Sequence, residues 1–304
     1  MVRGASMAIL SIQSRVSYGY VGNSIAVPAI QATGLEVWPL DTVSFSNHPG
    51  HGQFTGEVRS AAELEAQIDG LTALGVLDGI SAVLSGYLGL PGTAAVVAAA
   101  VDRTRASNPN LPFVLDPVIG DNGRHFVREG VAEAICEELL PRADIVTPNL
   151  YELGVLCGAA IPDEADVITE AARTLIRKSG LKAVAVTGIE RAGMVSNLLV
   201  LEETSYETMT LRLDRGFNGT GDLFAALLTA WFVRSGDIRS AFARAAGGLD
   251  AATRITAQAK RMELDLPAIL KSLKTLCPAA LVQGHYPGIQ AGSASCRRNR
   301  SRAS

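Results

Sequence analysis

The chain has 304 residues, of which 48% are hydrophobic and 19% are charged, with a formal net charge of −3. This composition is too apolar and too weakly charged for a disordered chain, and the length allows a single α/β domain with a large core. Thirty glycines and only 5% aromatic residues favour an α/β protein with many tight turns over an all-β sandwich. No apolar run is long enough to span a bilayer, so we expect no membrane partner.

The N-terminus and the cysteines favour a cytoplasmic protein. The first residues lack a signal-peptide pattern, because the apolar run that follows them breaks at Ser11 and Gln13. We interpret residues 1–7 as an N-terminal extension, with Met7 as an alternative start. The cysteines are widely spaced, without a CxxC pair or a nearby histidine, which argues against a disulfide framework or a zinc site. They are Cys136, Cys157, Cys277 and Cys296.

Short apolar, β-branched runs alternate with longer helical patterns along the first two thirds of the chain. The short runs predict strands at Ala8–Ile12, Val37–Val43, Ile80–Ser85, Phe113–Leu115, Asp144–Thr147 and Ala183–Thr187. The longer patterns predict helices at Ala61–Leu74, Gly92–Ser107, Val131–Leu140 and Glu164–Ser179. Continuous apolar strands separated by helices of this length are typical of an α/β fold with a mostly parallel central sheet covered by helices on both faces.

The pattern changes after this alternating region. Asn197–Leu201 and Thr208–Leu213 flank a short polar turn and predict a small antiparallel hairpin at the sheet edge. Two long helices are predicted next, at Thr220–Arg234 and Ile238–Gln258. No repeat or long linker divides the chain, so residues 8–277 are predicted to form one domain.

From residue 278 onward the composition turns to Gly, Ser, Pro and Arg. Four of the last eight residues are arginines, namely Arg297, Arg298, Arg300 and Arg302. We interpret residues 278–304 as a disordered basic tail, and contact of this tail with RNA or a membrane is the alternative. The pI near 5.9 gives no reason to expect a nucleic-acid partner.

A glycine-rich turn, Asn218-Gly219-Thr220-Gly221-Asp222, leads directly into an apolar helical pattern. Such a turn directs several backbone N–H groups at one point, where the helix dipole also favours negative charge, and so predicts an anion hole for phosphate. Asp222 is either a helix cap or a general base that takes a proton from an attacking hydroxyl group. The chain has neither a P-loop motif nor a G-x-G-x-x-G turn after its first strand, which disfavours both classes of nucleotide-binding protein.

Two further polar clusters follow predicted strands. Asp116 and Asp121 lie in DPVIGD after the strand that ends at Leu115, and Asn149 and Glu152 lie in TPNLYEL at the start of a helix. Ligands of open α/β sheets bind beyond the carboxyl ends of the strands, and clustered oxygen ligands suit Mg²⁺ held through water and substrate phosphates. Ordinary turn and capping roles are the alternative for Asp116 and Asn149.

Six segments, from residue 8 to residue 258, together resemble the pyridoxal kinases of the ribokinase superfamily in order and spacing. They are SIQSRVSYGYVGN, TVSFSNHPGHGQFTG, LSGYLG, LDPVIGD, TPNLYEL and GTGDLFAALL. The resemblance implies a ribokinase-like fold and ATP-dependent phosphorylation of the 5′-hydroxymethyl group of pyridoxal and related B6 vitamers. It also implies a homodimer, Mg²⁺ as cofactor, ATP as co-substrate and K⁺ as a further monovalent cation.

The resemblance also implies roles for individual residues. Asp222 matches the catalytic base and Ser14 matches the residue that hydrogen-bonds the pyridine ring. The anion hole is matched by Gly219, Thr220 and Gly221. The walls and edge of the vitamin pocket are matched by Val21, Val43, Phe45, His48, Pro49, Gly50, Phe54 and Tyr87. The nucleotide positions are matched by Asp116, Thr147, Asn149, Glu152 and Thr187, the metal positions by Asp121 and Glu152, and the loop over ATP by Arg215, Gly216, Phe217 and Asn218.

Several of these positions have a simpler alternative, and one departs from the family pattern. Phe45 and Phe54 are alternatively core residues, and His48 is alternatively a turn residue. Family members often have threonine or a similar polar residue where this chain has Pro49, which offers neither a hydroxyl group nor an N–H. The substrate preference is therefore open.

Two other functions remain as alternatives. Hydroxymethylpyrimidine kinase is the nearest alternative enzyme, but its glycine-rich DPSGGAG-like turn after the first strand is missing here. A vitamer-binding protein with weak catalysis is the alternative from another class. The intact Asp222 and its glycine turn favour an enzyme, because a binding protein needs no base beside an anion hole.

Overall fold

The computed structural model describes residues 7–273 and 278–284 of the chain. Its main sheet has the strand order β12-β11-β10-β9-β8-β5-β4-β1-β2-β3. The strands from β9 to β2 are parallel: β9 (Ala183–Arg191), β8 (Ile145–Val146), β5 (Phe113–Leu115), β4 (Ile80–Ser85), β1 (Ala8–Tyr18) and β2 (Glu36–Asn47). Antiparallel strands complete both edges: β3 (Gly56–Val58) beside β2, and β10 (Met194–Val200), β11 (Ser205–Leu211) and β12 (Val282–Gly284) beyond β9.

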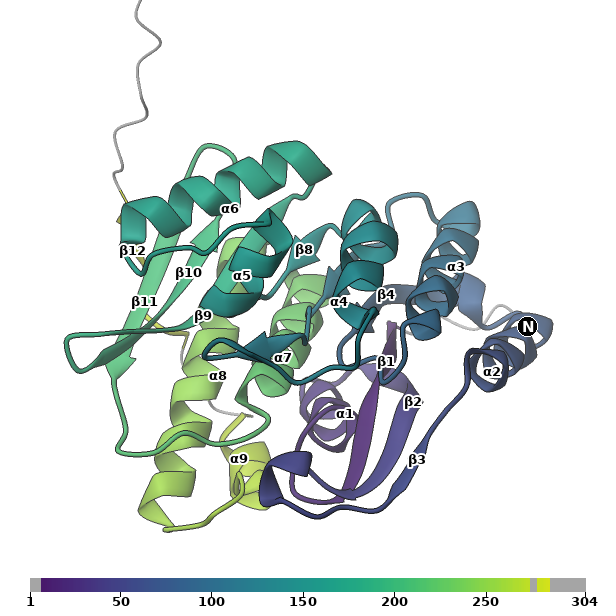
Figure 1. Cartoon of the computed structure of the whole chain (residues 1–304), viewed down its shortest axis with the longest axis horizontal. Coiled ribbons are helices and arrows are strands. Elements are labelled where there is room, and N and C mark those ends of the chain that lie inside the picture. The colour runs from purple at the N-terminus through teal and green to yellow at the C-terminus, as the bar shows by residue number, and fades with distance from the viewer. Residues whose placement is uncertain (1–6, 274–277, 285–304) are drawn as a thin grey trace, which may run out of the picture.

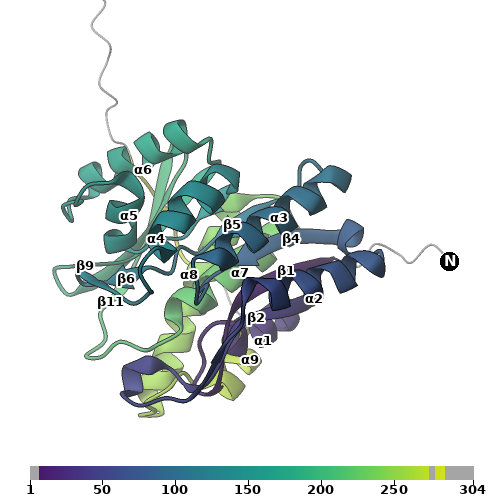
Figure 2. The same ribbon diagram turned by 45° about the vertical axis from the view of Figure 1, so that its right-hand side comes forward.

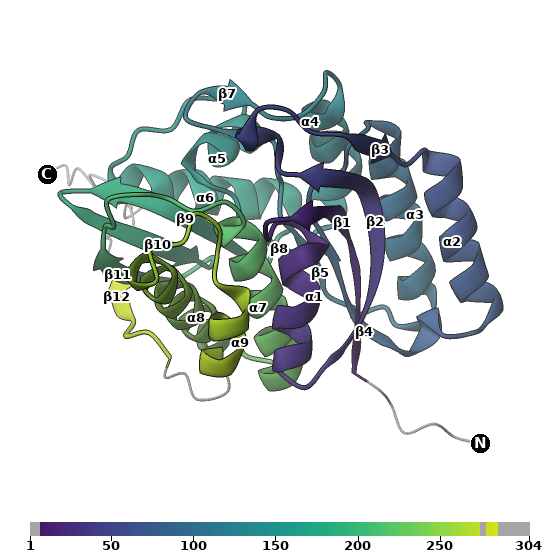
Figure 3. The same cartoon turned by 90° about the horizontal axis from the view of Figure 1, so that it is seen from below.

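Helices cover both faces of this sheet (Figures 1 and 3). One face carries α2 (Ala61–Ala73), α3 (Gly92–Ser107), α4 (Val131–Ala134), α5 (Leu150–Cys157) and α6 (Ala165–Ser179). The other carries α1 (Asn23–Ala32), α7 (Thr220–Ser235), α8 (Ile238–Gln258) and α9 (Leu266–Leu273). Because successive strand residues point to opposite faces, Leu10 and Ile12 of β1 join the first core and Ile9 joins the second. The predicted α/β fold with a mostly parallel, doubly covered sheet is therefore confirmed.

The predicted elements with a strong periodic pattern have nearly the predicted bounds. The hairpin is confirmed as β10 and β11, although β12 lies outside it in the sheet. The predicted helix Val131–Leu140 is wrong as one α-helix, since α4 ends at Ala134 and is followed by a π turn at Ile135–Leu139 and a 3₁₀ turn at Leu140–Arg142. Pro141 has no N–H to continue the α-helical hydrogen bonds, which accounts for the change. A separate two-stranded sheet, β6 (Gly120–Asp121) with β7 (Arg124–His125), was not predicted.

Part of the predicted tail belongs to the sheet, beyond the predicted domain end at residue 277. Val282–Gly284 pairs antiparallel with β11 as strand β12, so the chain returns to the sheet after that point. The remaining part of the predicted tail, with its four arginines, lies outside the described residues, as do residues 1–6 and two of the cysteines. The other two cysteines, Cys136 and Cys157, are free thiols. None of the helices described here is long and apolar enough to cross a membrane.

Candidate active site

A cleft of about 1540 Å³ runs along the carboxyl ends of the parallel strands. Its walls come from β1 with Ser14, β2 with Val43, the residues after β5 and β8 with Asp116 and Thr147, and the start of α7 with Asp222. This edge of the sheet is where open α/β folds bind their ligands. The structure thus brings the glycine turn and both polar clusters to one cavity.

Helix α7 begins at the glycine turn. Gly219 has a φ of +83°, and a Cβ atom at this position would lie 1.8 Å from the carbonyl oxygen of Tyr20, so only glycine fits. This close approach packs the connection between β1 and α1, with Tyr20 and Val21, against the start of α7. Asp222 is partly buried in the first turn; its burial raises the pKa of the carboxyl group, while the amide of Gly22 acts to lower it. A carboxylate therefore lies beside the converging backbone N–H groups.

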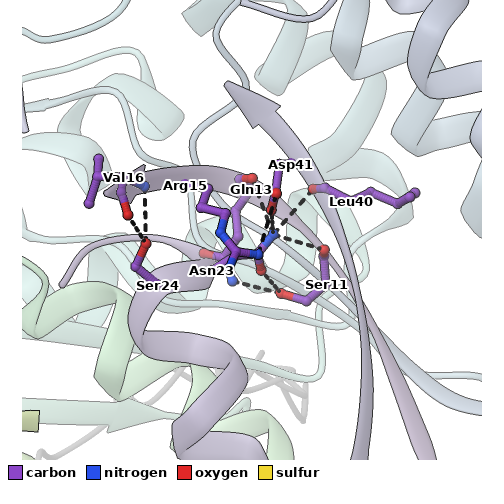
Figure 4. A network of polar contacts seen from close by, with 8 residues as sticks. All are labelled: Ser11, Gln13, Arg15, Val16, Asn23, Ser24, Leu40 and Asp41. Carbon is purple, nitrogen blue, oxygen red and sulfur yellow. Dashed lines mark hydrogen bonds and ion pairs between the residues drawn. The ribbon is translucent and has the colours of Figure 1, made fainter. Parts of the chain in front are cut away.

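A buried polar network determines how β1 presents Ser14 to the cleft (Figure 4). Asn23, the first residue of α1, lies between β1 and β2 and donates from Nδ2 to Asp41 Oδ1 at 2.8 Å. Its side chain also bonds with the Ser11 hydroxyl and with the carbonyl oxygens of Ser11, Gln13 and Leu40. These bonds lie directly before the point where the register between β1 and β2 shifts, between Gln13 and Arg15. Ser14 lies at this irregularity, so the network fixes the backbone that carries it.

One end of the cleft is apolar. Val16, Val21, Val43 and Phe45 form a small cluster of buried side chains, and Tyr87 packs against it. All of these line the cleft, together with His48, Pro49 and Gly50. Phe54 does not line the cleft: its ring packs on Phe45 at a centroid distance of 4.8 Å and is 43% exposed. The role of Phe54 as a pocket wall stays a prediction, and the structure places its ring against Phe45, which does line the cleft.

His48 stands before the 3₁₀ turn η1 (Pro49–His51). Its Nδ1 accepts a hydrogen bond from the Gly50 amide at 3.0 Å. Burial lowers the pKa of His48, the charge of His51 lowers it further, and Glu263 acts to raise it. The ring is therefore neutral at pH 7 and carries its proton on Nε2, which makes it a hydrogen-bond donor at the cleft wall.

Three carboxyl groups lie near one another on the polar side of the cleft. Asp116, buried after β5, accepts a hydrogen bond from Thr147 Oγ1 at 2.8 Å. Burial raises the pKa of Asp116 well above its usual range, and the charges of Glu152 and Asp222 raise it further, while Thr147 acts to lower it. A bound cation would relieve this mutual repulsion.

Glu152 is held by backbone groups from two segments. Its Oε1 accepts from the amides of Ile119 at 3.0 Å and Gly120 at 3.3 Å, and its Oε2 accepts from the Asn149 amide at 3.0 Å. The Asn149 side chain accepts from the Glu152 amide in return, which completes a capping box at the start of α5. Burial nevertheless raises the pKa of Glu152 to about 7. Both readings of this segment, as a cap and as part of a binding site, therefore fit the geometry.

No group of three or more His, Cys, Asp or Glu side chains within the described ranges is arranged to hold a metal ion by itself. Asp121 lines the cleft, and both of its oxygens accept from Asn122. The carboxylate oxygens of Asp121 and Glu152 suit Mg²⁺, because this ion keeps several waters and takes further ligands from substrate phosphates.

The predicted loop over the nucleotide lies only partly at the cleft. Asn218 lines it, as does Thr187 from β9, whereas Arg215, Gly216 and Phe217 are not among the lining residues, and their place over ATP stays a prediction. Arg215 donates to the carbonyl oxygen of Met262 at 3.2 Å and stacks over the Phe217 ring at 5.1 Å. Phe217 joins the core beneath α7, as its apolar ring favours.

Several residues at the cleft were not predicted. They include Val16, Val118, Phe126, Tyr151, Gly188 and Arg212. Tyr151 and Gly188 directly neighbour predicted site residues, so position next to a motif was an available signal for both. Phe126 follows β7 and Arg212 follows β11, both outside every motif, and only the fold brings them to the cleft.

Comparison with known proteins identifies the family. A family model described as phosphomethylpyrimidine kinase matches residues 35–265. The chain is 40% identical to pyridoxal kinase PdxY of Deinococcus radiodurans over 86% of this chain and 90% of that protein, and 37% identical to pyridoxal kinase PdxY of Rubrobacter xylanophilus over 90% and 96%. The structure of pyridoxal kinase from Leishmania donovani with ADP and pyridoxamine superimposes with a TM-score of 0.84 at 30% identity, covering 91% of this chain and 99% of that one. With matches of this extent in sequence and in structure, the chain belongs to the pyridoxal kinase family and has its ribokinase-like fold.

Proposed function

We propose that this protein transfers the γ-phosphoryl group of ATP to the 5′-hydroxymethyl group of pyridoxal, giving pyridoxal 5′-phosphate in vitamin B6 salvage. The observation that carries the proposal is a single cleft with two kinds of wall. An apolar pocket with Val21, Val43 and Phe45 suits a flat aromatic vitamin, and the polar strand ends suit a nucleotide. Asp222 and its glycine turn line the same cavity. The pyridoxal kinase relatives support this assignment.

In the proposed reaction Asp222 is the general base. A primary alcohol is a poor nucleophile at pH 7, so the carboxylate of Asp222 accepts the proton of the 5′-hydroxyl group as its oxygen attacks the γ-phosphorus. The bond from that phosphorus to the bridging oxygen of ADP breaks in the same transfer. Backbone N–H groups of the turn at Gly219, Thr220 and Gly221 stabilise negative charge on the transferred group.

Recognition of the vitamin is proposed to use few polar contacts. The Ser14 hydroxyl bonds to the pyridine ring, and its position depends on the Asn23 network between β1 and β2. Tyr87 and the valine and phenylalanine side chains of the pocket enclose the ring. His48 provides an Nε2–H donor, whereas Pro49 beside it provides none.

Nucleotide and metal are proposed to bind at the polar strand ends. Mg²⁺, when bound, neutralises charge on the ATP phosphates. Asp121 and Glu152 would hold it through water, and the second Glu152 oxygen, with one N–H partner, keeps capacity for such a contact. The nucleotide positions are Asp116, Thr147, Asn149, Thr187 and Asn218. K⁺ as a second cation and a homodimer complete the proposal and rest on the family resemblance, and a cytoplasmic location rests on the widely spaced cysteines.

The test is a panel of substrates with the purified protein and MgATP. Pyridoxal, pyridoxine, pyridoxamine and hydroxymethylpyrimidine are each supplied, and ADP and the phosphorylated product are measured. Preferred turnover of pyridoxal supports the proposal. Preferred turnover of hydroxymethylpyrimidine establishes the alternative that the description of the family model favours. Tight vitamer binding without any product establishes a binding protein.

A further inference from the structure

Glu263 lies in the connection between α8 and α9, outside every motif of the pocket. Its side chain is 8% exposed, and Oε1 lies 2.9 Å from Nε2 of His51. His51 ends the short turn η1, which follows β2 at the opposite end of the sequence. Figures 1 and 2 show this dark-blue turn beside the yellow-green chain between α8 and α9. This contact therefore joins the loop at the edge of the pocket to the helical layer.

The surroundings of Glu263 leave His51 as its one close polar partner among the residues described. Its Oε2 is buried without a hydrogen bond there. The carboxylate also packs against the chain after β1, where a Cβ atom on Gly19 would lie 2.7 Å from Oε2. The ring of Tyr18 lies edge-on to the ring of His51, at a centroid distance of 5.7 Å. Since a buried carboxylate is costly without a partner, the His51 contact decides where both groups lie.

The turn that carries His51 also carries two residues of the cleft wall. The His51 amide donates to the His48 carbonyl oxygen at 3.0 Å, and the Gly50 amide donates to His48 Nδ1 at 3.0 Å. A fixed His51 thus fixes His48 and Pro49. Asn47 also supports the loop, since its Nδ2 donates to the carbonyl oxygens of His48 at 3.2 Å and Gln53 at 3.0 Å. Residues 50–57 are exposed, so the contact of His51 with Glu263 is what ties this part of the loop to the helical layer.

We propose that Glu263 is a positioning residue for the vitamin substrate: through His51 it holds the His48–Pro49 wall of the pocket in the conformation that binds pyridoxal. This inference rests on the proposed function. The ATP side and Asp222 belong to other segments of the chain, so loss of the Glu263–His51 contact should leave them in place. The KM for pyridoxal should therefore rise about 3–10-fold, with kcat and the KM for ATP unchanged.

Two variants break the contact from opposite sides. Glu263→Leu removes both carboxylate oxygens, and His51→Leu removes the Nε2 donor. Each should raise the pyridoxal KM, and the Kd for pyridoxal measured by calorimetry with a non-hydrolysable ATP analogue should rise equally. The double variant should be no worse than the more impaired single variant, since both remove one interaction. If either single variant fails to fold, the other carries the test.

Arg261→Gln is the matched control. It breaks the 3.5 Å ion pair to Asp265 in the same connection, without touching the loop, and should leave all constants unchanged. An unchanged pyridoxal KM in the folded variants overturns the inference, as does an equal rise in the KM for ATP, which indicates a general structural role. Failure of the wild-type protein to phosphorylate pyridoxal is a different result and overturns the proposed function instead.

Discussion

Replacing Asp222 with asparagine keeps the shape of the side chain and its place at the start of α7 but removes the carboxylate that we propose as the general base. A positioned base contributes about 10²–10⁴-fold, which corresponds to about 2.7–5.4 kcal/mol of the barrier. The backbone donors of the glycine turn and the walls of the pocket remain unchanged. We therefore expect kcat to fall at least about 100-fold, with both KM values within about twofold of the wild type.

The pH dependence of kcat provides a second readout of the same variant. Burial raises the pKa of Asp222 above its ordinary value of 3.8. The base acts only when ionised, so wild-type kcat should fall as the pH is lowered through this raised pKa, about tenfold per pH unit below it. The residual activity of Asp222→Asn should lack this acidic limb.

Asp237→Asn is the control that separates a base from a helix cap. Asp237 also stands at a helix N-terminus, where it accepts hydrogen bonds from the amides of Arg239 and Ser240 at the start of α8. Asparagine caps a helix about as well as aspartate, so Asp237→Asn should keep full activity. Full turnover by Asp222→Asn refutes the assignment of a base, and so does a loss no larger than that of the control.

Three other substitutions test further parts of the site. Pro49→Thr restores a hydroxyl group at the edge of the pocket and should lower the KM for pyridoxal about 2–10-fold, the effect of one hydrogen bond of about 0.5–1.5 kcal/mol; steady-state kinetics that show an unchanged or raised KM contradict a contact with the vitamin. Glu152→Gln should raise the Mg²⁺ concentration for half-maximal rate more than it raises the pyridoxal KM, and equal increases would identify the capping box as its only role. Asn23→Ala removes a hydrogen-bond partner from the half-buried Asp41 and from the buried Ser11, so urea denaturation should show a loss of about 2–4 kcal/mol in the free energy of unfolding. The control, Asn110→Ala at an exposed position, should lose less than about 0.5 kcal/mol, and a loss below about 1 kcal/mol for Asn23→Ala would show that water replaces its side chain.

The local sequence pattern was sufficient to predict the long helices and the strands of the buried sheet. Gly92–Ser107 and Ile238–Gln258 have the predicted bounds because apolar residues recur on one helical face over many residues. The placement of Asp116 and Thr147 at one edge also follows from the sequence, since parallel strands end on the same side. Gly219 is needed at the start of α7 for two reasons. Its positive φ is a local feature, whereas the close approach of the Tyr20 carbonyl oxygen comes from another segment that no local pattern identifies.

Only the tertiary structure decided which distant residues meet. Phe45 begins the FSNH segment and Phe54 follows it, and their rings pack together, yet only Phe45 is among the residues that line the cleft. Strand β12 has only three residues, too few for a recognisable pattern, and it forms because it pairs with β11. Glu263 and His51 belong to different ends of the chain, and neither segment has a periodicity or motif that names its partner. Contacts of this kind depend on how the whole chain closes on itself, so their energy appears only once the sheet and both helical layers have formed.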